Sequence, residues 1–239
     1  RMYTCGPTVY DFSHIGNFRT FIFEDLLKRW LLHLGYEIKH VMNITDVDDK
    51  TIKKSISLNL PLNEITDKYI LNFMRDIEWL EICQADLYPK ATDYVEEMIE
   101  MIEKLIKNKM AYIADDKSVY FDILSFKDYG KLANIEIEGE LNNDFKVLKD
   151  EYNVNAPMDF ALWKARKAID GDVFWDSPWG QGRPGWHIEC SAMSTKLLGS
   201  HFDIHCGGID NIFPHHENEI AQSVGSNKKK FVNYWIHSE

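Results

Sequence analysis

Five consecutive residues near the N-terminus could form a phosphate-binding site. They are Ser13, His14, Ile15, Gly16 and Asn17, and they open the first helical pattern of the chain. A helix N-terminus presents free backbone N–H groups, and Gly16 would let a triphosphate approach the backbone. The His14 ring could donate a hydrogen bond to a phosphate oxygen and stabilise developing charge. The alternative is that His14 and Gly16 only begin the helix, and these residues alone favour that alternative.

A second group of residues could bind a metal ion. His215 and Glu219 are four positions apart, so on a helix they would share one face, which suits two ligands of one ion. The chain has four cysteines, at positions 5, 83, 190 and 206, and none of them forms a Cys-x-x-Cys pair. The spacing therefore allows a metal site without establishing one, and an exposed His–Glu pair is the commoner explanation.

Two further segments could contact a ligand, and each has a structural alternative. Asp46, Asp48 and Asp49 follow a predicted strand and could form a cation site, although they could equally cap and begin the next helix. Gly207 and Gly208 follow another predicted strand, where they could let a nucleotide lie close to the backbone or form a simple turn. The sequence favours the helix cap for the acids and leaves the glycines undecided.

The elements around the phosphate-binding candidates predict a βαβ unit. Residues 2–4 form a strand that enters a turn, and a helix follows from His14. Residues 38–42 form the next strand, after Gly35 ends the helix. Ligands of such units bind at the C-terminal ends of the strands, where the candidate residues lie. The helix is predicted from apolar residues that recur every three or four positions, namely Phe18, Ile22, Leu26, Leu27, Trp30, Leu31 and Leu34.

The rest of the chain continues the alternation of helices and strands. Helical patterns cover 46–58, 62–80, 91–109, 187–198 and 214–223, and strand patterns cover 112–113, 119–123, 202–205 and 231–237. Residues 170–185 carry Trp, Gly and Pro at turn spacing and predict a loop. Residues 127–154 are charged and poorly periodic, so we interpret about 100–165 as an insertion that interrupts the core.

Several motifs, in order along the chain, resemble those of cysteinyl-tRNA synthetases. They are residues 5–17 (CGPTVYDFSHIGN), 43–50 (NITDVDDK), 185–193 (GWHIECSAM), 202–210 (FDIHCGGID) and 213–219 (FPHHENE). The resemblance runs from Cys5 to about Trp235 and is weakest between 110 and 155. Class I synthetases carry His-Ile-Gly-His, whereas the fourth place here is Asn17, whose amide can donate a hydrogen bond but cannot become cationic.

The resemblance implies an α/β fold with a Rossmann-like doubly wound parallel sheet, interrupted by a connective-peptide insertion. We expect residues 1–99 to form the first half of the catalytic domain, 100–165 the insertion and 166–239 the second half. The Lys-Met-Ser-Lys-Ser loop, the helical domain and the anticodon-binding domain of the family have no counterpart in these 239 residues. We therefore expect a truncated core that is weakly active or inactive alone.

The resemblance also implies a zinc ion, one per chain, that binds the thiolate of the substrate. Carried over position by position, its ligands would be Cys5, Cys190, His215 and Glu219. Thiolate, imidazole and carboxylate ligands suit zinc. Serine differs from cysteine by one atom, and pocket shape alone discriminates poorly between near-isosteres. Zinc binds a thiolate far better than a hydroxyl, so the ion would select cysteine.

By the same resemblance, the remaining site residues bind ATP and the amino acid. His14 and Asn17 would act in catalysis. ATP would contact Thr8, His14, Gly16, Asn17, Gly207, Gly208 and Asp210, with Mg²⁺ as part of the substrate complex. L-cysteine would contact Gly6, Thr45, Trp186 and His205.

Composition limits the protein's class and its partners. No apolar run reaches the roughly 18 residues of a membrane helix, no signal peptide is visible, and the cysteines are too few for a disulfide framework. We therefore expect a cytoplasmic protein. The formal net charge of −11 argues against a protein that coats duplex nucleic acid, although it permits local contacts to RNA ends.

The implied activity is cysteine–tRNA ligation, with L-cysteine, ATP and tRNA(Cys) as substrates and a monomer as the expected state. Two rival interpretations remain at this stage. A cysteine ligase of mycothiol synthesis would make the same adenylate but transfer cysteine to an amino-sugar conjugate. A non-catalytic zinc-binding or RNA-binding paralogue would not make the adenylate, and the presence of His14, Gly16 and Thr45 argues against it.

Overall fold

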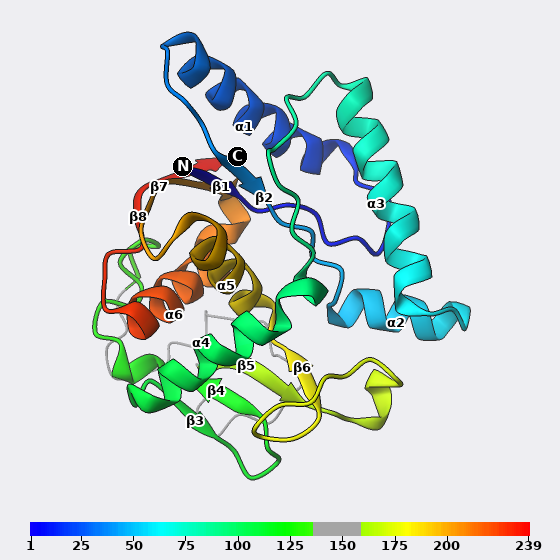
Figure 1. Cartoon of the computed structure of the whole chain (residues 1–239), viewed down its shortest axis with the longest axis vertical. Helices are drawn as coiled ribbons and strands as arrows, with labels where there is room; N and C mark the ends of the chain where they lie inside the picture. The colour runs from blue at the N-terminus through cyan, green and yellow to red at the C-terminus, as the bar shows by residue number, and fades with distance from the viewer. Residues whose placement is uncertain (136–158) are drawn as a thin grey trace.

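The computed structural model describes residues 1–135 and 159–239, and strands from both ends of the chain form a parallel β-sheet (Figure 1). Strands β1 (Met2–Thr4), β2 (His40–Met42), β7 (Phe202–Gly208) and β8 (Val232–Ser238) lie in the order β2-β1-β7-β8. Every pairing between them is parallel. Strand order reverses between β1 and β7, which is where ligands bind in sheets of this type. The predicted α/β fold with a parallel sheet is confirmed.

The connection from β1 to β2 passes through helix α1 (Ile15–His33), so the predicted βαβ unit is present. The apolar period predicted this helix but not its buried face. Phe18 and Phe21 are buried against Phe73 of helix α3 (Leu62–Trp79), whereas Leu26 and Trp30 are 65% and 58% exposed. A helix that packs on one side only cannot bury residues that are spread around its circumference.

Strands β3 (Ala111–Ile113), β4 (Val119–Phe121), β5 (Phe160–Ala165) and β6 (Gly182–Pro184) form a second, antiparallel sheet. It lies at the opposite end of the molecule from the parallel sheet (Figure 1). The loop predicted over 170–185 is wrong at 182–184, which pair with β5. The domain boundaries at 99 and 165 stay a prediction, and the charged segment predicted at 127–154 lies mostly outside the described residues.

Three helices lie between the two sheets (Figure 1), and each contributes buried residues to the hydrophobic core. They are α4 (Val95–Lys107), α5 (Trp186–Leu198) and α6 (Glu217–Asn227). The predicted stripe of α4 is confirmed at Val95, Met98, Ile102 and Leu105, which are all buried. Alternating charged residues face water along the opposite side, which is the pattern of an amphipathic helix.

Helices α2 (Asp49–Leu58) and α3 (Leu62–Trp79) follow β2. Helix α2 begins at Asp49, three residues later than predicted, because the side chain of Asp48 accepts a hydrogen bond from the Lys50 N–H and caps the helix. An irregular turn, Ile212–His216, precedes α6, so the helix predicted from residue 214 becomes regular only at Glu217.

Gly207 and Gly208 lie inside β7, where they pair with His237 and Ser238 of β8. The turn alternative is therefore wrong at these two positions, and a short 3-10 turn, Ile209–Asn211, follows them. Among the helices of residues 1–135 and 159–239, none has the length and apolar character to cross a lipid bilayer.

Candidate active site

A cavity of about 520 Å³ opens where β1, β2 and β7 end. Three predicted site residues, His205, Gly207 and Glu219, lie outside its wall. The others line it together, namely Cys5, Gly6, Thr8, His14, Gly16, Asn17, Thr45, Trp186, Cys190, Gly208, Asp210 and His215. The structure thus brings together residues that are more than 200 positions apart, while their roles in binding remain predictions.

The N-terminus of α1 forms one side of the cavity. His14 Nδ1 accepts a hydrogen bond from the Gly16 N–H, and Asn17 Oδ1 accepts one from the His14 N–H, both at 3.1 Å. A Cβ atom at Gly16 would lie 2.9 Å from His14 Cε1, so the glycine makes room for this ring. His14 therefore caps the helix, as the alternative held, Asn17 completes the cap, and both also line the cavity.

The loops after β1 and β2 join to form the floor of the cavity. Gly6 N donates to Asn43 Oδ1 at 3.0 Å, and a Cβ atom at Gly6 would lie 1.7 Å from the Asn43 carbonyl oxygen. Thr45 N donates to the Pro7 carbonyl, and Val9 N donates to the Thr45 carbonyl, both at 3.1 Å. Only glycine at position 6 allows this close approach, which places Thr45 on the cavity wall.

The three acids after β2 have structural partners. Asp46 accepts hydrogen bonds from Thr92, Asp48 caps α2, and Asp49 forms ion pairs with Lys164 and Arg183. The helix-cap alternative therefore holds for Asp48, which is the cap, and for Asp49, which begins α2, but not for Asp46. The Asp49 carboxylate joins the start of α2 to strands β5 and β6.

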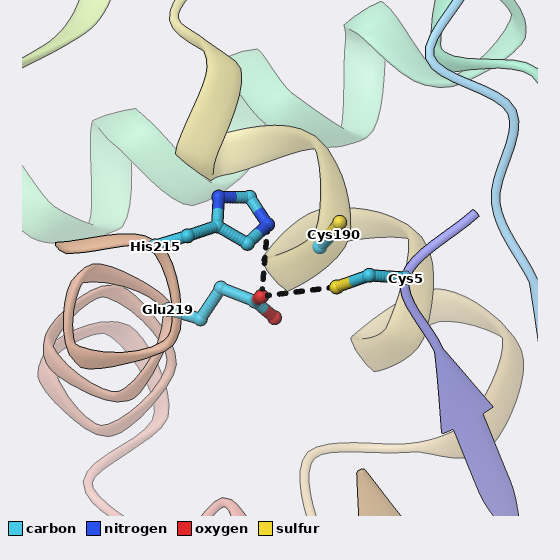
Figure 2. A group of neighbouring side chains, drawn as sticks. All are labelled: Cys5, Cys190, His215 and Glu219. Atoms are coloured by element: carbon cyan, nitrogen blue, oxygen red, sulfur yellow. Dashed lines mark hydrogen bonds and ion pairs between the residues drawn. The ribbon is translucent and has the colours of Figure 1, made fainter. Parts of the chain in front are cut away.

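Four buried donor groups meet beside the cavity (Figure 2). Cys5 comes from the loop after β1, Cys190 from α5, His215 from the turn before α6, and Glu219 from α6 itself. Their donor atoms all lie within 4.8 Å of one another. His215 Nε2 is 3.2 Å from Glu219 Oε1, and Cys5 Sγ is 3.9 Å from the same oxygen.

A second set of donors shares two members with the first. Cys5, His205, His216 and Glu219 also lie within 4.8 Å of one another. His205 and His216 lie outside the cavity wall, whereas Cys5, Cys190 and His215 line it. The first set, with three members on the cavity wall against one in the second, is therefore better placed to hold an ion that also contacts a ligand in the cavity. His205 Nε2 instead lies 2.8 Å from Glu219 Oε2 and orients that carboxylate from behind.

The imidazole of His215 can bind a metal ion without losing a proton, whereas the Cys5 thiol must lose one. Burial lowers the pKa of His215 to about 3, so its imidazole is neutral and can bind a metal ion. The hydrogen bond to Cys190 and burial raise the pKa of Cys5 well above its ordinary value. A bound divalent ion would replace these thiol protons, as thiolate ligation requires. Two sulfurs, one imidazole and one carboxylate fit zinc's preferred donors.

Aromatic and acidic groups complete the walls. The Trp186 ring stacks on His215 with 4.3 Å between ring centroids, which fixes both rings beside the donor cluster. On the far side, Asp210 is exposed and lies next to Gly208, where a Cβ atom would be 2.3 Å from Asp210 Oδ1. Two other tryptophans, Trp163 and Trp179, are buried core residues.

Sequence reasoning missed two polar residues of α5. His187 Nδ1 lies 2.9 Å from His215 Nδ1, and Glu189 accepts a hydrogen bond from the Thr45 hydroxyl at 3.0 Å. Both are buried. Their neighbours Trp186 and Cys190 were predicted site residues, so their position in the 185–193 motif was the available signal.

The family model described as "tRNA synthetases class I (C) catalytic domain" matches residues 1–239. The chain is 56% identical over 239 residues to the cysteine–tRNA ligase of Chlamydia trachomatis serovar D and 57% identical over 239 residues to that of Brachyspira hyodysenteriae. Each alignment covers 100% of this chain and 50% of the relative. The chain therefore spans about half the length of these curated relatives.

Among solved structures, Mycobacterium tuberculosis methionyl-tRNA synthetase bound by methionyl-adenylate superimposes with a TM-score of 0.70 at 12% identity. The match covers 99% of this chain and 56% of that one. A second structure of the same synthetase, in complex with methionyl-adenylate, gives a TM-score of 0.68 at 13% identity, with 99% of this chain and 56% of that one covered. At 12% and 13% identity, these similarities show a shared fold and nothing further.

Proposed function

Because the chain belongs to the family of class I (C) tRNA synthetase catalytic domains, we propose that it is the catalytic core of a cysteine–tRNA ligase. The enzyme activates L-cysteine with ATP and transfers it to tRNA(Cys). The observation that carries the proposal is the donor cluster of Cys5, Cys190, His215 and Glu219, which opens on the same cavity as the N-terminus of α1. One cavity can thus hold a thiol at one end and phosphates at the other.

In the first step, a carboxylate oxygen of cysteine attacks the α-phosphorus of ATP. The bond from that phosphorus to the bridging oxygen breaks, pyrophosphate leaves, and cysteinyl-adenylate remains. In the second step, a hydroxyl of the terminal adenosine of tRNA attacks the acyl carbon, and AMP leaves. Both steps depend on positioning and charge stabilisation more than on covalent chemistry by the protein.

The phosphates lie at the N-terminus of α1, where backbone N–H groups and the positive end of the helix dipole favour anions. His14 is held by its own cap contacts and directs its second ring nitrogen to the phosphates as a donor. Asn17 assists it, and Thr8 and Gly16 complete this side. The adenosine lies along Gly208, with Asp210 as the acceptor for a sugar hydroxyl, whereas Gly207 lies outside the cavity wall and makes room for the His216 ring. Mg²⁺ enters with ATP.

The amino acid lies on the floor formed by Gly6 and Thr45, against Trp186. When bound, zinc supplies thiolate recognition, which distinguishes cysteine from serine. Cys5, Cys190, His215 and Glu219 would hold the ion. His205 acts indirectly, because it contacts Glu219 and lies outside the cavity wall. We further propose a cytoplasmic monomer.

Two measurements on the whole protein test the proposal. ATP–pyrophosphate exchange should depend on cysteine and not on serine, and the purified protein should contain about one zinc per chain. Cys190→Ala should lose the zinc. Cys206→Ala is the matched control, since Cys206 is equally buried but lies outside the donor cluster, and it should keep the zinc.

Loss of zinc in both variants would point to general misfolding, and zinc retained in Cys190→Ala would contradict the assigned ligands. No cysteine-dependent exchange by a folded, zinc-loaded protein would refute the proposed activity. Transfer of the activated cysteine to an amino-sugar acceptor instead of tRNA would favour the mycothiol-type rival.

A further inference from the structure

Glu189 is a fully buried carboxyl group on α5, one position before Cys190. Its Oε2 accepts a hydrogen bond from the Thr45 hydroxyl at 3.0 Å. Its Oε1 has no hydrogen-bond partner within residues 1–135 and 159–239. Thr45 lines the cavity and Glu189 does not. The hydrogen bond from the Thr45 hydroxyl therefore links Glu189 to the cavity wall.

The hydrogen bonds of Thr45 determine what its hydroxyl offers to a ligand. A hydroxyl has one donor and two acceptor positions. Thr45 donates to Glu189 Oε2 and accepts from Asn43 Nδ2 at 3.2 Å, so an acceptor position remains for the cavity. Oε2 accepts this bond whether Glu189 is ionised or carries a proton on Oε1. The Thr45 hydroxyl thus keeps the same free acceptor position whether or not Glu189 is charged.

The backbone of Thr45 is held by its own hydrogen bonds, so Glu189 can control only the direction of the hydroxyl hydrogen. The backbone N–H and carbonyl of Thr45 bond to Pro7 and Val9 in the loop after β1. The hydrogen bond from Asn43 Nδ2 uses one acceptor position of the hydroxyl and leaves the direction of its hydrogen open. The bond to Glu189 selects the position in which the hydroxyl hydrogen points away from the cavity.

We propose that Glu189 is a positioning residue for the α-ammonium group of the amino acid substrate. An ammonium group has only donors, so it complements the acceptor that Thr45 presents, whereas a carboxylate does not. The inference rests on the proposed function, which places an amino acid in the cavity. Helix α5 then serves both ends of the substrate, with Cys190 at the thiol and Glu189, through Thr45, at the ammonium group.

The test uses Glu189→Met in the whole protein, because methionine has a similar volume and no strong acceptor. The KM for cysteine should rise about tenfold, since an ionic hydrogen bond is present in both the ground state and the transition state. The kcat and the KM for ATP should change less than about twofold. Glu189→Gln should stay near the wild type, because its amide oxygen can still accept from Thr45.

Two controls separate this role from a structural one. In a Thr45→Val background, Glu189→Met should cause no further rise in the KM for cysteine, because it acts through that hydroxyl. 3-Mercaptopropionate, which lacks the ammonium group, should inhibit the wild type and Glu189→Met equally. Zinc content and the unfolding midpoint are measured for every variant, and Glu189→Ala replaces Glu189→Met if the latter does not fold.

An equal rise in KM in the Thr45→Val background would overturn the inference. Equal weakening of 3-mercaptopropionate and cysteine would also overturn it. An active wild type whose KM for cysteine is unaffected by Glu189→Met refutes the inference alone. A folded, zinc-loaded wild type without cysteine-dependent exchange refutes the proposed function itself.

Discussion

Asp170→Ala should destabilise the protein strongly, because Asp170 compensates a buried guanidinium. Asp170 Oδ1 accepts from Arg183 Nε at 3.0 Å, and its Oδ2 accepts from the Lys167 N–H at 2.6 Å. The side chains of Asp170 and Arg183 are 2% and 4% exposed. Removal of one partner of a buried ion pair costs about 3–5 kcal/mol. Because Arg183 would keep its ion pair with Asp49, we expect a loss of about 3 kcal/mol.

That loss should lower the midpoint of thermal unfolding by roughly 6–12 °C in a chain of this size. Asp172→Ala is the matched control. Asp172 also pairs with an arginine, Arg166, but at 3.7 Å and with a fully exposed side chain, so its removal should leave the midpoint unchanged. Thermal unfolding followed by circular dichroism measures the midpoints of both variants, and urea unfolding measures their free energies of unfolding. Equal unfolding free energies for the two variants would refute the reasoning from burial.

Two further predictions concern a close contact in the floor of the cavity and His40, a buried histidine of β2. Gly6→Ala should lower the free energy of unfolding by about 2 kcal/mol, because the alanine Cβ would lie 1.7 Å from the Asn43 carbonyl oxygen. It should also lower the rate of cysteine-dependent exchange about tenfold or more. A wild-type free energy of unfolding in urea would contradict this prediction. Stability should fall as the pH drops from about 6.5 to about 4. Burial, assisted by the nearby Lys28 charge, lowers the pKa of His40 to about 4, so the unfolded chain takes up the proton first. His40→Gln should flatten this part of the curve in urea titrations at stepped pH, and an unchanged slope would rule His40 out as the cause.

The sequence predicted those elements whose pattern reflects contacts on one face. Helix α4 is the clearest case, because the apolar stripe from Val95 to Leu105 faces the core and its acids face water. The period of α1 predicted a helix but not its orientation, since Leu26 and Trp30 belong to the pattern and are exposed. Periodicity records where apolar residues lie around a helix, whereas burial depends on which neighbours are present.

The donor cluster depended on long-range pairing that no local pattern contains. Cys5 approaches Glu219 because β1 pairs with β7, with Cys5 N donating to the Cys206 carbonyl at 3.1 Å. Only the resemblance of whole motifs predicted that group of residues. The sequence also did not predict that Gly207 lies inside a strand, for a related reason. Glycine is depleted in strands, but the His216 ring packs where a Cβ of Gly207 would lie, at 2.8 Å, so the strand requires glycine there.

The residues that sequence reasoning missed lie where polar side chains are buried in a helix. Every residue of α5 from His187 to Ser194 is buried, and a pattern of this kind has no water-facing side from which orientation could be predicted. Buried polar groups are costly unless they are hydrogen-bonded, so each needs a partner that another element supplies. Ser191 donates to Gln222 at 2.6 Å, His187 contacts His215, and Glu189 accepts from Thr45. Such a helix holds the faces of several elements in one arrangement, and a substitution on it should alter ligand binding through its partners before it alters the fold.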